Sequence, residues 1–471
     1  MSALPVLLWS DVLIWLLALA AVALGVLSRR DPPSRAIWRR VGANRPGMAA
    51  ATFLAAFVLV GLVDSLHYRP LLDGPPGQPA VHAVEVLSAL DAIAAPLRLR
   101  HEKTYSEPLA TRAYAKETVE VRAADGSARA ARDFPRLKHG GAHLGSDEAE
   151  RGGDVLKRVS SAVLLAVALF AALALGTARL LARRAGSRAR QAWSALWKGE
   201  TGFAWNAVLI ALGVLLLVLL PILALCGDYH VFGTDKVGQD VFYQILKSVR
   251  TALVIGLVTT LVTLPLAIGL GILAGYFRGW VDDAIQYLYT TLSSIPGVLL
   301  IAAAVLMMQV IIDTHPQWFA TAAERADLRL LSLCFILGLT SWTGLCRLLR
   351  GETLKLRELE YIQAAQSFGV ADLAILWRHV LPNLMHLVII ALVMDFSSLI
   401  LAEAVLSYVG IGVDPTMVSF GTMINSARME LSREPAVWWS LASAFAFMFA
   451  LVLAANLLAD AVREAFDPRA G

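Results

Sequence analysis

Charged residues are scarce in this chain. Of its 471 residues, 17% are charged and 57% are hydrophobic, whereas soluble domains have roughly 25% and 45–50%. This balance excludes an ordinary soluble domain and indicates a polytopic membrane protein. The net charge is only +4, and the positive residues cluster in short loops, which favours membrane topology over nucleic-acid binding. We therefore expect membrane lipid, and no nucleic acid, among its partners.

Cysteine is also rare, and several catalytic motifs are missing. Cys226, Cys334 and Cys346 lack the spacing of a metal site or a disulfide framework. The sequence has no G-x-x-x-x-G-K-[ST] phosphate loop, no HExxH zinc motif and no G-x-S-x-G esterase turn. The stretch "HEKTYS" at 101–106 is not a zinc helix. We therefore expect no catalytic residue, no metal and no cofactor, and we expect any ATP hydrolysis to occur in another subunit.

Long apolar runs are abundant instead. A spanning helix needs roughly 20 mostly apolar residues, and nine segments meet that length. They lie at about 11–28, 48–66, 158–181, 204–226, 250–276, 290–312, 328–346, 382–405 and 437–462. Pro296 and Gly297 interrupt the sixth segment, and such residues are tolerated where a helix packs against other helices.

Basic loops predict the orientation of these spans. The loops at 29–45, 179–198 and 347–357 are rich in arginine, so we expect them in the cytoplasm. The N-terminus is then outside and the C-terminus inside. Residues 67–157 form a polar outer lobe in this arrangement, either β-rich or irregular. Within it, "ETVEVRAADGSARAARDF" predicts a β-hairpin because Asp-Gly separates two alternating runs.

The stretch "EYIQAAQSFGVADLAILWRHVLPN", residues 360–383, is too polar to span a membrane. Its periodicity predicts two short helices joined at Gly369, which fits a cap with positive φ. Asp372 can cap the second helix, and Pro382 suits the first turn of the next one. Two apolar faces follow from the helical period. They consist of Leu359, Ile362, Ala365 and Phe368, and of Leu373, Leu376, Trp377 and Val380.

This stretch resembles the "EAA" loop of ABC importer permeases, because Ala-Ala is followed by Gly and then Leu-Pro at the family's spacing. The resemblance implies that the loop, at 358–382, is a coupling helix that docks on a cytoplasmic ATPase. Gln363 stands where the family often has Glu. The implied docking residues are Gln363, Ala364, Ala365, Phe368, Gly369, Leu381 and Pro382.

Four further stretches resemble the dipeptide/oligopeptide/nickel permeases of the second-subunit type. They are "HVFGTDKVGQDVFYQILKSVRTAL", "AGYFRGWVDDAIQYLYTTLSSIP", "AEAVLSYVGIGVDP" and "VSFGTMINSAR". The first gives a motif at the periplasmic mouth made of Gly233, Thr234, Asp235, Gly238 and Asp240. We expect Asp240 to cap a short amphipathic helix at 241–249 on the outer membrane surface, and Asp235 to cap its own turn.

The resemblance implies an all-α fold with a six-helix permease core. We expect this core at 191–471, and at 1–190 an N-terminal extension with about three additional spans and the outer lobe. A second permease, two cytoplasmic ABC ATPases and an extracytoplasmic binding protein are the implied partners in a bacterial inner membrane. Peptides are the expected substrate, with nickel or another small solute as alternatives.

An ion-coupled secondary transporter is the rival hypothesis. Its signature would be acidic residues within the membrane, and the eighth span offers Asp395 and Glu403 near Ser398. These side chains can line a pathway or bond neighbouring helices.

A stretch of the extension is similar in sequence to a stretch of the core. "HLGSDEAERGGDVLKRVSSAVLLAV" at 143–167 is similar to the segment that starts at His230, which indicates a diverged partial duplication. Because the outer lobe shows no pathway-like segment, we also expect a chain that starts near Arg188 to insert and pair.

Overall fold

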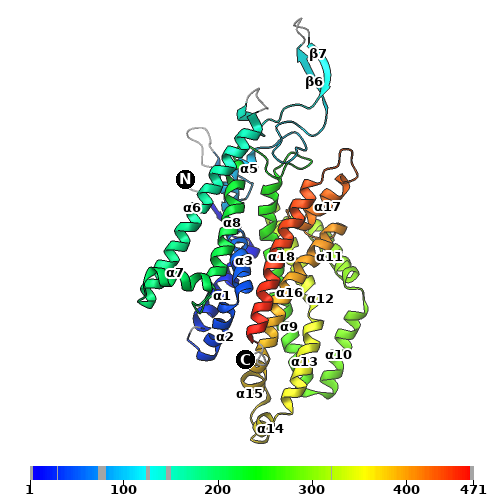
Figure 1. The fold of residues 1–471 in the computed structure, drawn as a ribbon. Helices are drawn as coiled ribbons and strands as arrows, with labels where there is room; N and C mark the ends of the chain where they lie inside the picture. Colours follow the sequence, from blue (N-terminus) through cyan, green and yellow to red (C-terminus); the bar gives the residue numbers. More distant parts are fainter. Residues whose placement is uncertain are drawn as a thin grey trace. The chain divides into compact units, whose positions relative to one another are not determined.

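The computed structural model describes residues 4–28, 30–72, 81–122, 128–144, 150–319 and 321–466 (Figure 1). Within these ranges it has nine helical segments long and apolar enough to cross a membrane, which confirms the nine expected spans. They are α1 (Trp9–Ser28), α3 (Arg45–Asp64), α6 (Arg151–Ala185), α8 (Trp205–Leu225), α9 (Val241–Phe277), α11 (Gly297–Thr314), α12 with α13 (Ala322–Ser341, Thr343–Arg357), α15 to α16 (Asp372–Ile375, Leu381–Val409) and α18 (Trp439–Phe466).

Two expected boundaries are wrong. The sixth span begins at Gly297 rather than 290, because Pro296 separates it from α10 (Gly279–Ser294). Residues 241–249 do not form a separate surface helix, since they are the first turns of the continuous 37-residue α9. Their apolar side chains Val241, Ile245 and Val249 are buried within the protein. A run of apolar residues without a break therefore extends the span outward.

The chain divides into two compact units that do not follow the sequence order. The first contains Gly42–Arg250 and Val418–Leu451, and the second contains Val6–Val41, Thr251–Met417 and Val452–Gly471. Parts of the N-terminal extension occur in both units. The boundary expected near residue 190, between the extension and the permease core, stays a prediction, and the two compact units divide the chain differently.

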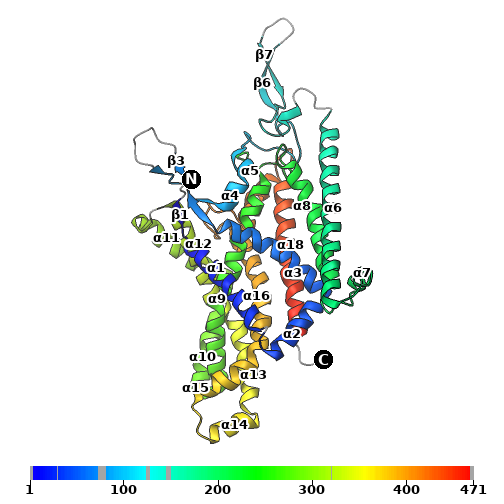
Figure 2. The ribbon, with the colours of Figure 1, turned by 90° about the vertical axis from the view of Figure 1, so that its left-hand side faces the viewer.

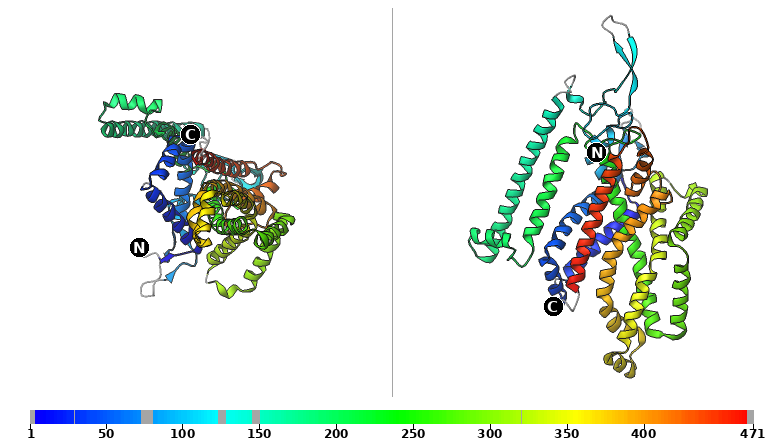
Figure 3. Two further views of the ribbon diagram at one scale, coloured as in Figure 1. Left: turned by 90° about the horizontal axis from the view of Figure 1, so that it is seen from below. Right: turned by 45° about the vertical axis from the view of Figure 1, so that its right-hand side comes forward.

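The first unit is built around α6 and α8, which lie side by side (Figures 1 and 3). Helix α3 packs on α8 as well, and Leu196 of α7 (Ala189–Lys198) is fully buried against Ala174, Ala178 and Leu209. Helix α17 (Phe420–Glu430) also belongs to this unit. Two spans of the extension thus share a core with the span that precedes the mouth motif.

The outer lobe contains the short strands that were expected and also short helices that were not. Strands β2 (His67–Arg69) and β5 (Leu87–Ser88) pair antiparallel next to β1 (Leu4–Val6), and β3 (Leu71–Leu72) pairs with β4 (Val81–His82). The short helices are α4 (Ala89–Ile93), α5 (Ala95–Leu99) and the 3₁₀ turn η1 (Ala142–Leu144).

The expected hairpin is present as β6 (Glu117–Arg122) paired with β7 (Ala128–Asp133), and it extends away from the rest of the lobe (Figure 2). The Asp-Gly turn that suggested it lies outside the described residues.

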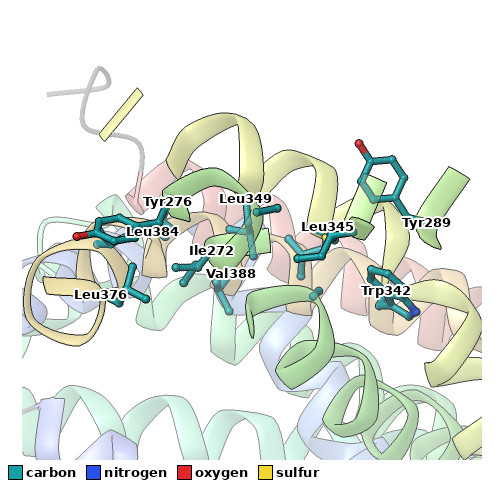
Figure 4. Packing of buried hydrophobic residues seen from close by; sticks show 14 of the residues in the cluster. Ile272, Tyr276, Tyr289, Trp342, Leu345, Leu349, Leu376, Leu384 and Val388 are labelled. Atoms are coloured by element: carbon teal, nitrogen blue, oxygen red, sulfur yellow. The ribbon is translucent and has the colours of Figure 1, made fainter. Parts of the chain in front are cut away.

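The core of the second unit lies where α9, α13 and α16 meet. Leu349, Val380 and Leu384 are buried there together with Ile272 and Trp342 (Figure 4). Helix α2 (Pro32–Ala43) packs its Ile37 and Val41 against the end of α18. Helix α14 (Glu360–Ser367), the 3₁₀ turn η3 (Pro316–Trp318) and the turn η4 (Leu376–Val380) complete the elements of this unit.

Candidate coupling loop and outer mouth

The expected coupling loop is a helix–turn–helix with a rigid base. Gly369 has φ of +73°, so the predicted positive-φ cap after α14 is confirmed. Pro382 lies in the first turn of α16, also as predicted. Ile362, Ile375 and Val380 are fully buried in the core of the second unit, next to Leu376. The loop is therefore held by its own apolar side chains and not by its polar ones alone.

Large apolar side chains remain exposed on this base. Phe368 is 86% exposed, Leu373 67% and Trp377 69%. Soluble surfaces rarely expose such a group of large apolar side chains without a partner, and the sequence of this loop is too polar for a span. The loop thus has an exposed apolar surface next to the exposed Ala364.

The two predicted apolar faces are partly wrong. Ile362 turns into the protein while Phe368 turns out, and Leu376 and Val380 are buried while Leu373 and Trp377 are not. The reason is that the loop lies between the protein core and the exposed surface. Each short helix therefore has some apolar side chains in the core and others on the surface.

Polar contacts fix the turn between α14 and α15. The hydroxyl of Tyr276 donates to Asp372 Oδ1 over 2.7 Å, and Gln366 donates to the same hydroxyl oxygen over 3.0 Å. Asp372 is therefore not the helix cap that its position suggested, since the cap position is Ala371. Gln363 donates to the carbonyl oxygen of Glu358 over 3.3 Å, and Glu358 pairs with Arg278. These contacts tie the loop to the end of α9.

The outer motif is paired with the outer lobe through its main chain. The N–H of Glu102 donates to Gly238 O over 2.9 Å, and the N–H of Thr234 donates to Ser106 O over 3.1 Å. The Thr234 hydroxyl accepts from the N–H of Ser106 over 2.7 Å. Trp439 of α18 donates its indole N–H to Thr234 O over 3.0 Å. Residues 102–106 therefore lie along the motif within one compact unit.

The two glycines of the motif permit this close approach. Gly233 and Gly238 have φ of +72° and +75°. A Cβ at Gly238 would lie 1.9 Å from Glu102 O, and one at Gly233 would lie 2.5 Å from Ser106 O. Side chains at either position would push the lobe strand away from the motif.

Asp240 caps α9 as expected, and it also belongs to a buried cluster. Its Oδ1 accepts from the N–H of Phe242 over 2.8 Å. Its Oδ2 lies 2.7 Å from His230 Nδ1, and His230 Nε2 lies 3.4 Å from Glu102 Oε1. We call Glu102, His230 and Asp240 the buried clasp. Asp235, by contrast, accepts from the N–H groups of its own turn at Val237 and Gln239, as predicted.

Charge compensation stabilises the ionised forms of the clasp. Burial lowers the pKa of His230, but the hydrogen bonds to Asp240 and Glu102 outweigh burial and raise that pKa to about 9. Burial raises the pKa of Glu102, yet bonds from His230 and from the N–H groups of Gly140, Lys138 and His139 bring it to about 2. At neutral pH the His230 imidazole is thus protonated, and it lies between the side chains of Glu102 and Asp240.

The comparisons agree with this geometry. Residues 267–471 match the family model "Binding-protein-dependent transport system inner membrane component". The chain is 34% identical over 242 residues to the glutathione transport system permease protein GsiD of Pectobacterium atrosepticum, covering 51% of this chain and 73% of that protein. The chain belongs to this family of inner-membrane transport permeases.

Other matches to this permease have similar coverage. The oligopeptide transport system permease protein OppC of Mycobacterium bovis is 31% identical, with 51% of this chain and 77% of that protein covered. The dipeptide transport system permease protein DppC of Lactococcus lactis is 29% identical, with 52% and 65% covered. A solved chain of the MetNI methionine ABC transporter has 14% identity and a TM-score of 0.37, and the match covers 48% of this chain and 97% of that one.

The acidic residues in α16 of the permease are not joined into one site. Glu403 is buried and accepts from the Ser407 hydroxyl over 2.6 Å. Asp395 is half-buried, and Ser398 donates to its main-chain oxygen over 2.8 Å. The Glu403 carboxylate is thus bonded within α16, whereas the Ser398 bond involves only the main chain of Asp395, and the role of the Asp395 carboxyl group stays a prediction.

Sequence reasoning missed three residues of the permease that lie in or near the outer motif and bind partners far along the chain. Glu102 lies in "HEKTYS", which was considered only as a zinc pattern. His230 precedes the motif by three residues and was not singled out. Lys247 binds Asp64 Oδ1 over 2.7 Å and Asp91 Oδ1 over 3.2 Å. A carboxylate whose basic partner lies far along the chain has no pattern in its own stretch of sequence that would predict the pair.

Proposed function

We propose that the chain is one of two permease subunits in an ATP-driven importer of peptides. Its core forms half of the translocation pathway, and a separate ATPase, one of two in the complex, docks on loop 358–382. The observation that carries this proposal is the group of exposed apolar side chains, Phe368, Leu373 and Trp377, on a buried and hydrogen-bonded base. A secondary transporter has no use for such a surface.

Peptide transport is proposed because the relatives are named for it. Glutathione, oligopeptides and dipeptides all contain peptide-like backbone groups, as the names of the three related permeases indicate. A binding protein on the outer side would deliver the substrate. The N-terminus is then outside and the C-terminus in the cytoplasm, in agreement with the basic loops.

Docking can be tested with one charge placed in the loop. Ala364 is exposed, whereas Ala365 packs partly against the core, so Ala364→Asp alters the docking surface without burying a charge. We expect Ala364→Asp to reduce co-purification of the ATPases and to abolish uptake, while the two permeases still form a complex. Ala130→Asp, at an exposed alanine in β7, is the matched control. Unchanged uptake by the Ala364→Asp variant would contradict the proposal.

Substrate and orientation need separate measurements. Vesicles that contain the whole complex should accumulate labelled di- or oligopeptides, and not nickel, in the presence of ATP and binding protein. Orientation can be tested by placing single cysteines and adding a thiol reagent that does not cross the membrane to intact cells. Lys116 is an exposed position in the outer lobe, whereas Ser106 is buried and would not react, so Lys116→Cys should be labelled from outside. Labelling at Ser187 instead of Lys116 would show that the proposed orientation is inverted.

A further inference from the structure

A dense group of cations surrounds the turn between α6 and α7. The group consists of Arg179, Arg183, Arg184, Arg188, Arg190 and Lys198, all of which are exposed. Between Asp154 and Glu200 the sequence has no acidic residue. These cations therefore lack a carboxylate from their own segment, and their counter-ions must come from elsewhere.

Helix α7 has a fixed position beside this group. It does not continue α6, because the left-handed Gly186 ends that helix and the chain then turns (Figures 1 and 2). Leu196 and Ala192 are buried, with Leu196 packed on α6 and α8. The other faces of α7 remain open. Packing on two membrane-spanning helices holds α7 close to the end of the apolar part of α6.

Two tryptophans of α7 are partly exposed, and the ring of Trp197 also lies 6.4 Å from the ring of Phe170 of α6, centroid to centroid. Trp193 and Trp197 are one turn apart, with ring centroids separated by 5.8 Å, and they are 37% and 36% exposed. Indole rings favour the boundary between lipid tails and headgroups, since they combine an apolar surface with one polar N–H. An amphipathic helix with tryptophans and flanking cations is typical of a segment that lies in the membrane interface.

We propose that the turn between α6 and α7 is a binding site for anionic lipid headgroups. The indoles of Trp193 and Trp197 lie among the acyl-chain carbons nearest the headgroups, and the arginines from Arg183 to Arg190 pair with headgroup phosphates. A topological signal alone would need only the positive charges. The docked helix and its paired indoles indicate a lasting contact with lipid, whatever solute the permease carries.

The test uses the full chain in nanodiscs of phosphatidylcholine and phosphatidylglycerol. Native mass spectrometry measures which lipid stays bound. We expect the wild type to retain phosphatidylglycerol preferentially. The variant Arg183→Gln/Arg184→Gln/Arg188→Gln/Arg190→Gln should lose that preference by on the order of tenfold, since each cation near an anionic surface contributes to binding. Replacement of the same four arginines by lysine should keep most of it.

Two controls keep the result decisive. Arg112→Gln/Lys116→Gln/Arg132→Gln in the outer lobe should leave the preference unchanged. Glycerol phosphate without acyl chains should not displace the lipid, and equal binding of that soluble anion would overturn the proposal. The same preference in the glutamine variant as in the wild type would overturn it too.

A second measurement does not depend on the folding of the glutamine variant. Lipids brominated near the headgroup or deep in the acyl chain quench tryptophan fluorescence. The difference in quenching between the wild type and Trp193→Phe/Trp197→Phe reports on these two rings. We expect the shallow bromines to quench this component more strongly. Equal or stronger quenching by the deep bromines would exclude an interfacial position for α7.

Discussion

Two His–Asp pairs in the first unit occupy matching places in the two similar stretches of sequence but have different surroundings. His230 and Asp240 precede α9, and His143 and Asp154 adjoin α6 with Nε2 and Oδ2 2.9 Å apart. The side chains of Glu102, His230 and Asp240 are 3%, 5% and 0% exposed. Those of His143 and Asp154 are 29% and 22% exposed. The same pairing can thus be buried and costly to break, or exposed and dispensable.

The partners of the two pairs explain this difference. The buried pair receives a second carboxylate, Glu102, from the outer lobe, and three main-chain N–H groups saturate that carboxylate. The exposed pair is joined by Arg158, which contacts both Asp154 and Asp228, and by the Tyr229 hydroxyl. Water can replace partners in the second cluster but cannot reach those in the first.

The largest effect is expected from Glu102→Ala. The change leaves the His230 imidazolium with one carboxylate and leaves three buried N–H groups without an acceptor. We expect a loss of about 3–5 kcal/mol in the free energy of unfolding, which is typical of breaking a buried ion pair. Thermal unfolding of the purified permease measures it. Glu107→Ala, at an exposed glutamate of the same segment, is the control, and a similar loss there would contradict the special role of Glu102.

Alkaline pH should weaken the buried clasp next. The pKa of His230 is raised to about 9 in the folded protein, so its stabilising effect is complete below about pH 6.5 and disappears as the pH rises through 9. The expected loss is up to about 3 kcal/mol. Melting temperatures from pH 7 to above 10 should fall more for the wild type than for His230→Gln. Parallel curves would show that the clasp does not hold this proton.

A methyl group at Gly238 tests the close approach of the lobe. Gly238→Ala adds backbone strain and a clash with Glu102 O at 1.9 Å, whereas Gly202→Ala, with φ of +69° and open space, adds the strain alone. We expect Gly238→Ala to cost about 1–3 kcal/mol more than Gly202→Ala. Chemical denaturation of the two variants gives the difference. Equal costs would mean that the lobe strand moves away freely.

The smallest effect is expected from Asp154→Asn. The exposed cluster keeps Asp228 as a partner for Arg158, and exposed ion pairs contribute only about 0–1 kcal/mol. The melting temperature should therefore change little. A loss as large as that of Glu102→Ala would remove the contrast between the two pairs.

Much of the fold was readable from the sequence because its signals are local. Runs of apolar residues predicted the nine spans, and the glycine and proline of residues 369 and 382 predicted the turns around the coupling loop. The predicted start of the sixth span was wrong by several residues, since Pro296 separates α11 from the helix before it.

The site at the mouth was only partly readable. The spacing of Gly238 and Asp240 predicts the motif. Glu102 and Asp64 bind His230 and Lys247 from distant parts of the chain, and a single carboxylate in those parts gives no pattern that predicts these contacts. The expectation that a chain starting near Arg188 inserts and pairs must therefore be revised. Such a chain keeps Asp240 but lacks Glu102, the second carboxylate at His230, and the two carboxylates that Lys247 binds, so we expect it to misfold at the mouth.

The contact between Trp439 and Thr234 has a consequence for biogenesis. The indole donor lies in the last helix, 205 residues after its acceptor, and Glu102 is made 128 residues before His230. The ribosome releases these three segments at widely separated times, so the mouth closes only after α18 has left the translocation machinery.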